Sequence, residues 1–274
     1  MGSSKFAPPA LKAFQDSHPE IEVGVPGGPW RYRETAREGD ALILLPGAQG
    51  TADMFYRIAP ALGQHLRVVT ATPPPVADCA ALAQALPAFL NAMGLTRAHL
   101  LGSSLSGHVL QLFAAQHPHR VNTLFLANTF CDASPYQGSM PTAEAIAATP
   151  ATQLLAGMLA RMQAGPDDEP SQRELKQAVQ ALMGRHQSPE ALRTRLLALR
   201  LSGTAPVVPL PSNRIVLIDG DDDPVILPVM REALRRRYAQ AEHHNLAGGG
   251  HYPYILRAPQ YADAIAMRLL GRTP

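Results

Sequence analysis

The sequence predicts an α/β fold in which a mostly parallel, doubly wound sheet carries an inserted helical cap. Short runs that are apolar at every position recur along the chain, as in strands buried on both faces of a parallel sheet. Segments with helical periodicity separate these runs, which is typical of a sheet covered by helices on both sides. One junction between an apolar run and a helical segment, residues 99–108, is rich in serine and glycine and predicts a tight strand–turn–helix corner.

The N-terminal part of the chain predicts a strand pair and then a buried strand. Residues 21–25 and 30–35 alternate between apolar and polar side chains, and Pro26-Gly27-Gly28-Pro29 lies between them. We therefore expect an antiparallel pair at a sheet edge. Residues 41–45 are apolar throughout, as in a central strand.

Helices and strands then alternate up to residue 130. The expected elements are a helix over about 52–62, a strand over 67–71, a helix over 78–93, a strand that ends at the corner, a helix through 109–116 and a strand over 121–130. In such a sheet, ligands bind beyond the carboxyl ends of the strands, where the corner lies.

The alternation stops after residue 130, and amphipathic helical patterns replace it. Three apolar stripes lie within 154–162, 175–183 and 192–199, and proline-containing breaks separate them. We expect these leucines and methionines to form packing faces, and the arginines of this segment to lie on helix surfaces.

The alternation resumes near residue 213. The expected elements are a strand over 214–220, a helix over about 228–239, a short strand near 243–246 and a final helix over about 259–270. The chain is therefore predicted to consist of a core, residues 1–130 and 213–274, and a helical cap inserted as residues 131–212.

Composition argues against several classes of partner. Hydrophobic residues make up 46% of the 274 residues and charged residues 17%, as in an ordinary globular protein. The net charge of +2 is too small to indicate nucleic-acid binding. Cys79 and Cys131 lack metal-ligand spacing and form no disulfide framework. With neither a signal-peptide pattern nor an apolar run of roughly 18 residues, we expect a cytoplasmic protein without a membrane span.

The corner has the properties of a nucleophile elbow, with Ser104 as the nucleophile. Strand and helix almost touch at such a turn, so the residues two before and two after the nucleophile must be small. Gly102 and Ser106 occupy these positions. Ser106 departs from the usual glycine but is small enough to fit.

Ser104, Asp223 and His251 follow predicted strands in the order nucleophile, acid, histidine. A serine hydroxyl needs a base to accept its proton, and histidine suits this role when a carboxylate orients it. Asp223 lies three residues after Gly220, and His251 lies in a glycine-rich loop.

Other residues compete for these roles. Asp221 and Asp222 are alternatives for the acid. The remaining histidines considered, His108, His243 and His244, lie in a helix or in and beside a strand, where packing explains them.

An oxyanion hole needs two backbone N–H groups that point at the oxygen gaining charge. The residue after the nucleophile, Leu105, supplies one. Ala48, or alternatively Gln49, supplies the other from the loop Pro46-Gly47-Ala48-Gln49-Gly50.

These three motifs, in this order, resemble the α/β-hydrolase superfamily from about residue 21 to the end. Within it, the segments 45–57, 126–134 and 249–254 resemble the maspardin-like subfamily. The resemblance implies a role as a binding protein, because maspardin-like proteins have a polar residue other than histidine at the position that His251 occupies in this chain. This chain keeps histidine, which favours catalysis.

The sequence therefore predicts a serine hydrolase that cleaves an ester, thioester or related acyl bond of a small-molecule substrate through an acyl-enzyme. A maspardin-like binding or scaffold protein is the alternative, and the same machinery also serves lyases and acyltransferases. No nucleotide, flavin or metal motif is present, and we expect no cofactor. The sequence leaves the oligomeric state open.

Overall fold

The computed structural model describes residues 7–35, 38–184 and 187–271, and its strands form a mostly parallel sheet. The strands are β1 (Ile21–Val25), β2 (Gly28–Glu34), β3 (Ala41–Leu45), β4 (Arg67–Thr72), β5 (Ala98–Ser103), β6 (Val121–Ala127), β7 (Ile215–Asp219) and β8 (Glu242–Asn245). Their spatial order is β1-β2-β4-β3-β5-β6-β7-β8. The β1–β2 and β2–β4 pairs are antiparallel, and the remaining pairs are parallel. The predicted fold class and the antiparallel pair at one edge are confirmed.

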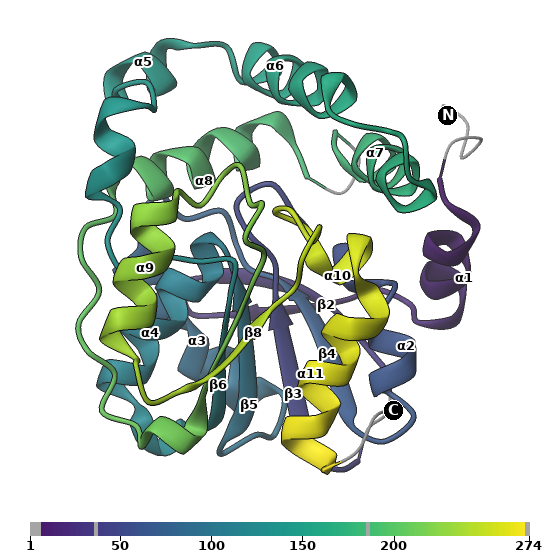
Figure 1. Ribbon diagram of the computed structural model, residues 1–274, viewed down its shortest axis with the longest axis vertical. Helices are drawn as coiled ribbons and strands as arrows, with labels where there is room; N and C mark the ends of the chain where they lie inside the picture. Colours follow the sequence, from purple (N-terminus) through teal and green to yellow (C-terminus); the bar gives the residue numbers. More distant parts are fainter. Residues whose placement is uncertain (1–6, 36–37, 185–186, 272–274) are drawn as a thin grey trace.

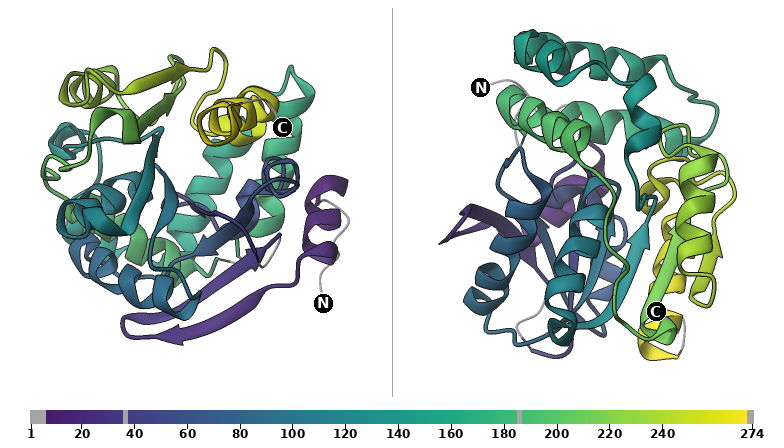
Figure 2. Two further views of the ribbon diagram at one scale, coloured as in Figure 1. Left: turned by 90° about the horizontal axis from the view of Figure 1, so that it is seen from below. Right: turned by 90° about the vertical axis from the view of Figure 1, so that its left-hand side faces the viewer.

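Helices cover both faces of the sheet (Figures 1 and 2). They are α1 (Pro9–Ser17), α2 (Ala59–Leu62), α3 (Cys79–Ala92), α4 (Leu105–Gln116), α5 (Ala143–Ala148), α6 (Ala151–Ala164), α7 (Pro170–Leu182), α8 (Pro189–Leu201), α9 (Pro228–Arg237), α10 (Pro253–Leu256) and α11 (Ala258–Leu270). Helices α3, α4 and α9 pack on one face, while α2 and α11 pack on the other.

The two faces of the sheet belong to two separate apolar clusters. In β3, Ile43 and Leu45 pack with α3 and α4, while Leu42 and Leu44 pack with the side chains of α2 and α11. Successive side chains of a strand point to opposite faces, so a strand between two helical layers is apolar at every position. This explains the continuous apolar run over 41–45.

Four helices, α5–α8, follow β6 and precede β7 in the sequence. They cross the end of the sheet toward which β3 points (Figure 1). The two ends of this segment meet, because the Ala205 N–H donates to the Cys131 carbonyl at 2.8 Å. The segment therefore leaves and rejoins the sheet at nearly the same place.

Among the predicted elements whose bounds differ in the structure, two differ for a clear physical reason. The helix expected over 52–62 is divided into a 3₁₀ turn (Ala52–Phe55) and α2, which has Pro60 in its first turn. Proline has no N–H and disfavours helical geometry in the residue before it, which favours the start of a new helix at this point. The strand expected over 121–130 ends at Ala127, because Asn128 has a φ of 42°. Helices α1, α5 and α10 were not predicted.

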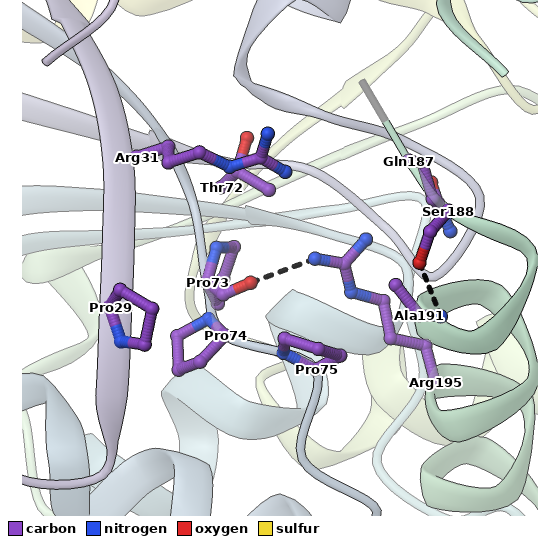
Figure 3. Close-up of a pocket in the computed structure, with 10 residues that line it drawn as sticks. All are labelled: Pro29, Arg31, Thr72, Pro73, Pro74, Pro75, Gln187, Ser188, Ala191 and Arg195. Carbon is purple, nitrogen blue, oxygen red and sulfur yellow. Dashed lines mark hydrogen bonds between the residues drawn. The ribbon is translucent and has the colours of Figure 1, made fainter. Parts of the chain in front are cut away.

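Arg195 of α8 is buried, contrary to the expectation that the arginines of this segment lie on helix surfaces. Its guanidinium donates to the Pro73 carbonyl at 2.7 Å (Figure 3). It also donates to the Gly50 carbonyl at 3.4 Å. These two carbonyls follow β4 and β3, so the arginine joins α8 to the carboxyl edge of the sheet. The apolar periodicity of α8 gives no sign of this contact.

Within the described residues, no helix combines the length and the apolar character needed to cross a bilayer. Cys79 and Cys131 are free and buried.

A buried ion pair fixes the N-terminal helix to the sheet. The Arg33 Nε donates to the Asp53 carboxylate at 2.5 Å, and both side chains are almost fully buried. Gln15 of α1 donates to the same carboxylate at 2.6 Å, and Arg33 also donates to the His18 carbonyl. One carboxylate thus joins α1, β2 and the turn after β3.

Replacing Asp53 with alanine leaves the Arg33 guanidinium buried without its carboxylate. We expect Asp53→Ala to lower the free energy of unfolding by about 3–5 kcal/mol, measured by urea denaturation. Glu232→Ala is the control, since its pair with Arg236 is exposed, and it should cost less than about 1 kcal/mol. A loss below 1 kcal/mol for Asp53→Ala would contradict this role.

Candidate active site

The corner predicted from the sequence joins β5 to α4 at Ser104. Ser104 has a φ of 53° and a ψ of −121°, a strained backbone conformation for a residue with a side chain. A Cβ added to Gly102 would lie 2.5 Å from the Ser106 carbonyl oxygen, so only glycine fits there. The turn is therefore as tight as the spacing of small residues predicted.

Ser106, which stands where glycine is usual, makes a contact of its own. Its hydroxyl donates to the Pro46 carbonyl at 2.5 Å, and both residues are buried. This bond fixes the loop 46–50 to the first turn of α4. The loop passes so close that a Cβ on Gly47 would lie 2.8 Å from the Ser104 Cβ.

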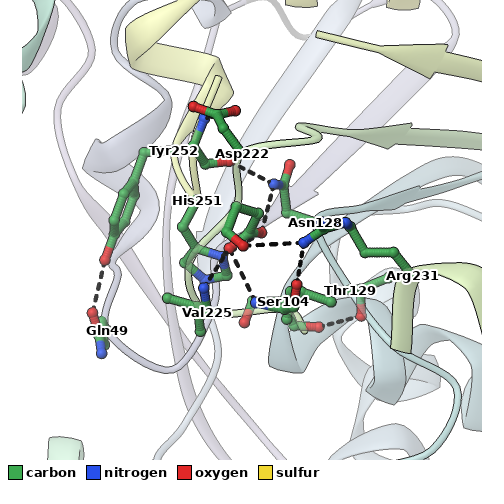
Figure 4. A network of polar contacts seen from close by, with 12 residues as sticks. Gln49, Ser104, Asn128, Thr129, Asp222, Val225, Arg231, His251 and Tyr252 are labelled. Carbon is green, nitrogen blue, oxygen red and sulfur yellow. Dashed lines mark hydrogen bonds and ion pairs between the residues drawn. The ribbon is translucent and has the colours of Figure 1, made fainter. Parts of the chain in front are cut away.

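His251 and Asp223 are hydrogen bonded to each other. Figure 4 shows the network of polar contacts in which His251 lies. The His251 Nδ1 lies 2.9 Å from Asp223 Oδ2 and 3.1 Å from Oδ1. The two residues come from the loops after β8 and β7, and their exposed fractions are only 9% and 5%. An acceptor at Nδ1 keeps the proton on that nitrogen and leaves Nε2 free to accept another.

The Asp223 carboxylate is held in its ionised form. Burial raises its pKa, but attraction to His251 and hydrogen bonds from His251, the Asn128 amide and the Ile226 N–H together bring the pKa below the ordinary carboxyl value. Oδ1 also accepts from the Val225 N–H at 2.7 Å. The carboxylate is thus fixed in place by donors besides the imidazole.

Two residues of this network were not identified as functional from the sequence. Asn128 donates to Asp223 Oδ2 at 2.8 Å and to the Gly250 carbonyl at 2.9 Å, so it joins the acid loop to the histidine loop. Arg231 of α9 donates to the Asp223 carbonyl at 3.0 Å and to the Asp221 carbonyl at 2.8 Å. Asn128 comes directly after β6, and this position could have identified it from the sequence as a site residue. No sequence feature identifies Arg231.

The alternatives for the acid lie elsewhere. Asp221 is exposed, and Asp222 accepts the Gly250 N–H at 3.0 Å without contacting the imidazole.

The other histidines also lie outside the site. His108 is buried against Phe130, with ring centroids 5.0 Å apart. His243 pairs with Asp219 at 3.1 Å, and His244 pairs with Glu242 at 2.7 Å.

Ser104 and His251 line one small cavity of about 30 Å³. The Ser104 hydroxyl makes no hydrogen bond with His251 among the described residues, and such contacts often close only when substrate is bound. A second cavity of about 450 Å³ shares with the first the residues Gln49, Val225, His251 and Tyr252. The Tyr252 hydroxyl donates to Gln49 Oε1 at 2.7 Å, so this pair lies between the two cavities.

Several apolar residues of the inserted helices line these cavities, although we expected packing faces. Leu196 and Leu199 line the small cavity, and Met158, Met162 and Leu175 line the larger one. Arg161 also lines the larger cavity. Apolar periodicity identifies the face of each helix that points inward. It does not distinguish the residues of that face that pack against the core from those that line a cavity.

The backbone N–H groups of Ala48, Gln49 and Leu105 donate to no group in the described part of the chain. All three residues lie beside Ser104, since Ala48 and Gln49 line its cavity and Leu105 follows it at the start of α4. The Ala48 carbonyl accepts from the Gln187 side-chain amide at 2.8 Å. The described residues contain no cluster of three or more His, Cys, Asp or Glu side chains placed to hold a metal.

The family model described as "alpha/beta hydrolase fold" matches residues 40–258. Among curated relatives, human maspardin is 29% identical over 238 residues, which cover 84% of this chain and 74% of maspardin. The 2-hydroxy-6-oxo-6-phenylhexa-2,4-dienoate hydrolase of Comamonas testosteroni is 31% identical over 109 residues, 35% of this chain and 38% of that enzyme.

A solved structure of a hydrolase from Pseudomonas aeruginosa has the same fold. It superposes with a TM-score of 0.71 and 24% identity, and the match covers 92% of this chain and 98% of that one.

Removing the Ser106 hydroxyl leaves the buried Pro46 carbonyl without its donor. We expect Ser106→Ala to lower the free energy of unfolding by about 1–3 kcal/mol in urea denaturation. The exposed Ser212 provides the control, since Ser212→Ala should leave stability within about 0.5 kcal/mol. Equal stability of the two variants would show that the contact does not hold the loop.

Burial of His108 makes folding sensitive to acid. Desolvation, with a smaller effect of Arg237, lowers the pKa of His108 to about 4, so the folded protein resists a proton that the unfolded chain accepts below about pH 6.5. The free energy of unfolding should therefore fall by about 2–3 kcal/mol on this account between pH 7 and pH 4. Urea titrations across this range should show a flatter profile for His108→Gln. The exposed His119 offers the comparison, and a steep profile in His108→Gln equal to that of His119→Gln would refute the assignment.

Proposed function

The chain belongs to the alpha/beta hydrolase fold family, and on that premise we propose that it is a serine hydrolase that cleaves carboxylic esters, thioesters or related acyl bonds. One observation carries the proposal: the strained elbow serine, Ser104, and the Asp223-paired His251 line the same cavity. A serine at such a turn has its hydroxyl exposed to substrate, and the paired histidine is the base that it needs.

In the first step, the Ser104 Oγ attacks the carbonyl carbon of the substrate. Its proton passes to Nε2 of His251, since Nδ1 is occupied by the bond to Asp223. The carboxylate stabilises the imidazolium that forms, and its own proton affinity is too low to take the proton away.

The negative charge on the carbonyl oxygen needs donors at this moment. The Leu105 N–H and the Ala48 N–H, with Gln49 as the alternative to Ala48, are backbone donors beside Ser104 without other acceptors. Removal of one such donor in an oxyanion hole costs about 10²–10³ in rate. The bonds from Ser106 and Gln187 hold the loop that carries Ala48.

The intermediate then expels the alcohol or thiol, which takes the proton from His251 as it leaves. A water molecule gives its proton to the same nitrogen and attacks the acyl-enzyme, and the carboxylic acid is released with Ser104 restored. The reaction consumes one water for each bond that is cleaved and needs no further reactant.

We also propose that residues 131–212 act as a cap over the core formed by 1–130 and 213–274. Side chains of α6 and α7 line the larger cavity and side chains of α8 line the small one, so this segment bounds the space that substrate can fill. The larger cavity has methionine, leucine, proline and valine side chains in its lining, which suit an apolar group of medium size, and the charged side chains Arg161, Lys176 and Asp222 line it as well.

Similarity to maspardin supports a second candidate, a binding or scaffold protein whose partner docks on the inserted helices. The two candidates differ in one measurable property, the reactivity of the Ser104 hydroxyl.

We expect a fluorophosphonate probe to label the protein at one site, identified as Ser104 by peptide mass spectrometry. Ser104→Ala should abolish labelling, while His251→Ala and Asp223→Asn should slow it by about 10³–10⁴-fold because the base is lost or held in the wrong tautomer. His243→Ala is the matched control, since it removes another aspartate-paired histidine outside the site.

A folded protein that the probe does not label would contradict the hydrolase proposal and favour the scaffold candidate. Labelling that persists in His251→Ala at the original rate would show that His251 is not the base.

A further inference from the structure

A separate cavity of about 280 Å³ lies between β2, the segment after β4 and the start of α8. It shares no lining residue with the cavity of Ser104. Its walls include Arg31, Thr72, the prolines at 73–75, Gln187 and Arg195 (Figure 3). None of the residues used in the proposed reaction lies in it.

Two guanidinium groups point into this space from opposite sides, Arg31 from β2 and Arg195 from α8 (Figure 3). Arg195 is buried, and its two hydrogen-bond acceptors are neutral carbonyls. Arg31 is half-buried and forms an ion pair at 3.8 Å with Glu20, which does not line the cavity. The residues that line the cavity, as far as the structure describes them, include no carboxylate.

Arg195 carries its charge in a buried place beside a second cation. Burial, and to a smaller extent repulsion from Arg31, lowers the pKa of its guanidinium to about 10. Two cations facing one cavity repel each other, and an anion between them would relieve this repulsion.

Two further features of the wall favour an anion. Helix α8 begins there, and although the Ser188 hydroxyl already accepts the Ala191 N–H at 3.1 Å, the partial positive charge of the helix N-terminus remains. The Thr72 Oγ1 accepts the Ala52 N–H at 2.7 Å, which leaves its own hydroxyl proton available for donation.

We propose that this cavity binds a small oxyanion, a phosphate or carboxylate group held between Arg31 and Arg195 at the start of α8. An anion bound in this cavity would contact side chains that also hold the loop 46–50 in place. Arg195 donates to the Gly50 carbonyl and Gln187 to the Ala48 carbonyl, so the same two side chains form a wall of this cavity and hold that loop.

The test is isothermal titration of the Ser104→Ala protein with inorganic phosphate and, separately, with acetate, at constant ionic strength set by chloride. The substitution removes the nucleophile of the proposed reaction, so the result does not depend on whether the hydrolase proposal is correct. Saturable binding of one anion per chain is expected, and the two probes distinguish a phosphate site from a carboxylate site.

Arg31→Gln in the same background should weaken binding by about tenfold or more, because it removes one charged donor of the pair. Arg31 lies on a strand near the sheet edge, so this variant should keep the thermal unfolding midpoint of the parent. Arg236→Gln is the control for loss of one positive charge, since Arg236 is exposed on α9, and it should leave affinity unchanged. Absence of saturable binding for both anions, or equal affinity of Arg31→Gln and Arg236→Gln, would overturn the proposal.

Discussion

The close approach of three backbone segments at Ser104 is the constraint on which the rest of the site depends. Gly102 and Gly47 each lie so near their neighbours that a single added carbon would overlap the turn. This crowding holds the serine at a positive φ and raises its hydroxyl above the end of β5. Ala48 and Leu105, whose N–H groups donate to no group within the described residues, lie beside Ser104 for the same reason.

The second half of the site is organised by hydrogen bonds rather than by crowding. Asn128, at the end of β6, connects the loop of Asp223 to that of His251, and Arg231 holds the backbone of the acid loop from α9. The Asn128 amide and the Ile226 N–H donate to the carboxylate and favour its ionised form, so the histidine faces a fixed negative charge. The loops after three neighbouring strands therefore act as one unit, although they are far apart in the sequence.

The sequence predicted much of this fold because its strongest signals are local. Continuous apolar runs identify strands between two helical layers, and small residues around Ser104 identify a turn with no space for larger ones. The sequence could not predict the role of a residue whose contacts come from distant parts of the chain. Arg195 has the pattern of a surface arginine, and only the folded chain shows that backbone carbonyls after β3 and β4 accept its protons. Ser106 likewise seemed a tolerated variant, although its hydroxyl fixes the loop 46–50.

The central claim is that the Ser104 hydroxyl is activated for acyl transfer, and the most direct measurement of it is pre-steady-state hydrolysis of p-nitrophenyl acetate. An acyl-enzyme mechanism predicts a burst of p-nitrophenolate that approaches one equivalent per chain, together with an acetylated protein seen by intact mass at early times. Both should be absent in Ser104→Ala. A release of p-nitrophenolate that is linear from the start, carries no acetyl adduct and is equally fast in Ser104→Ala would contradict the account.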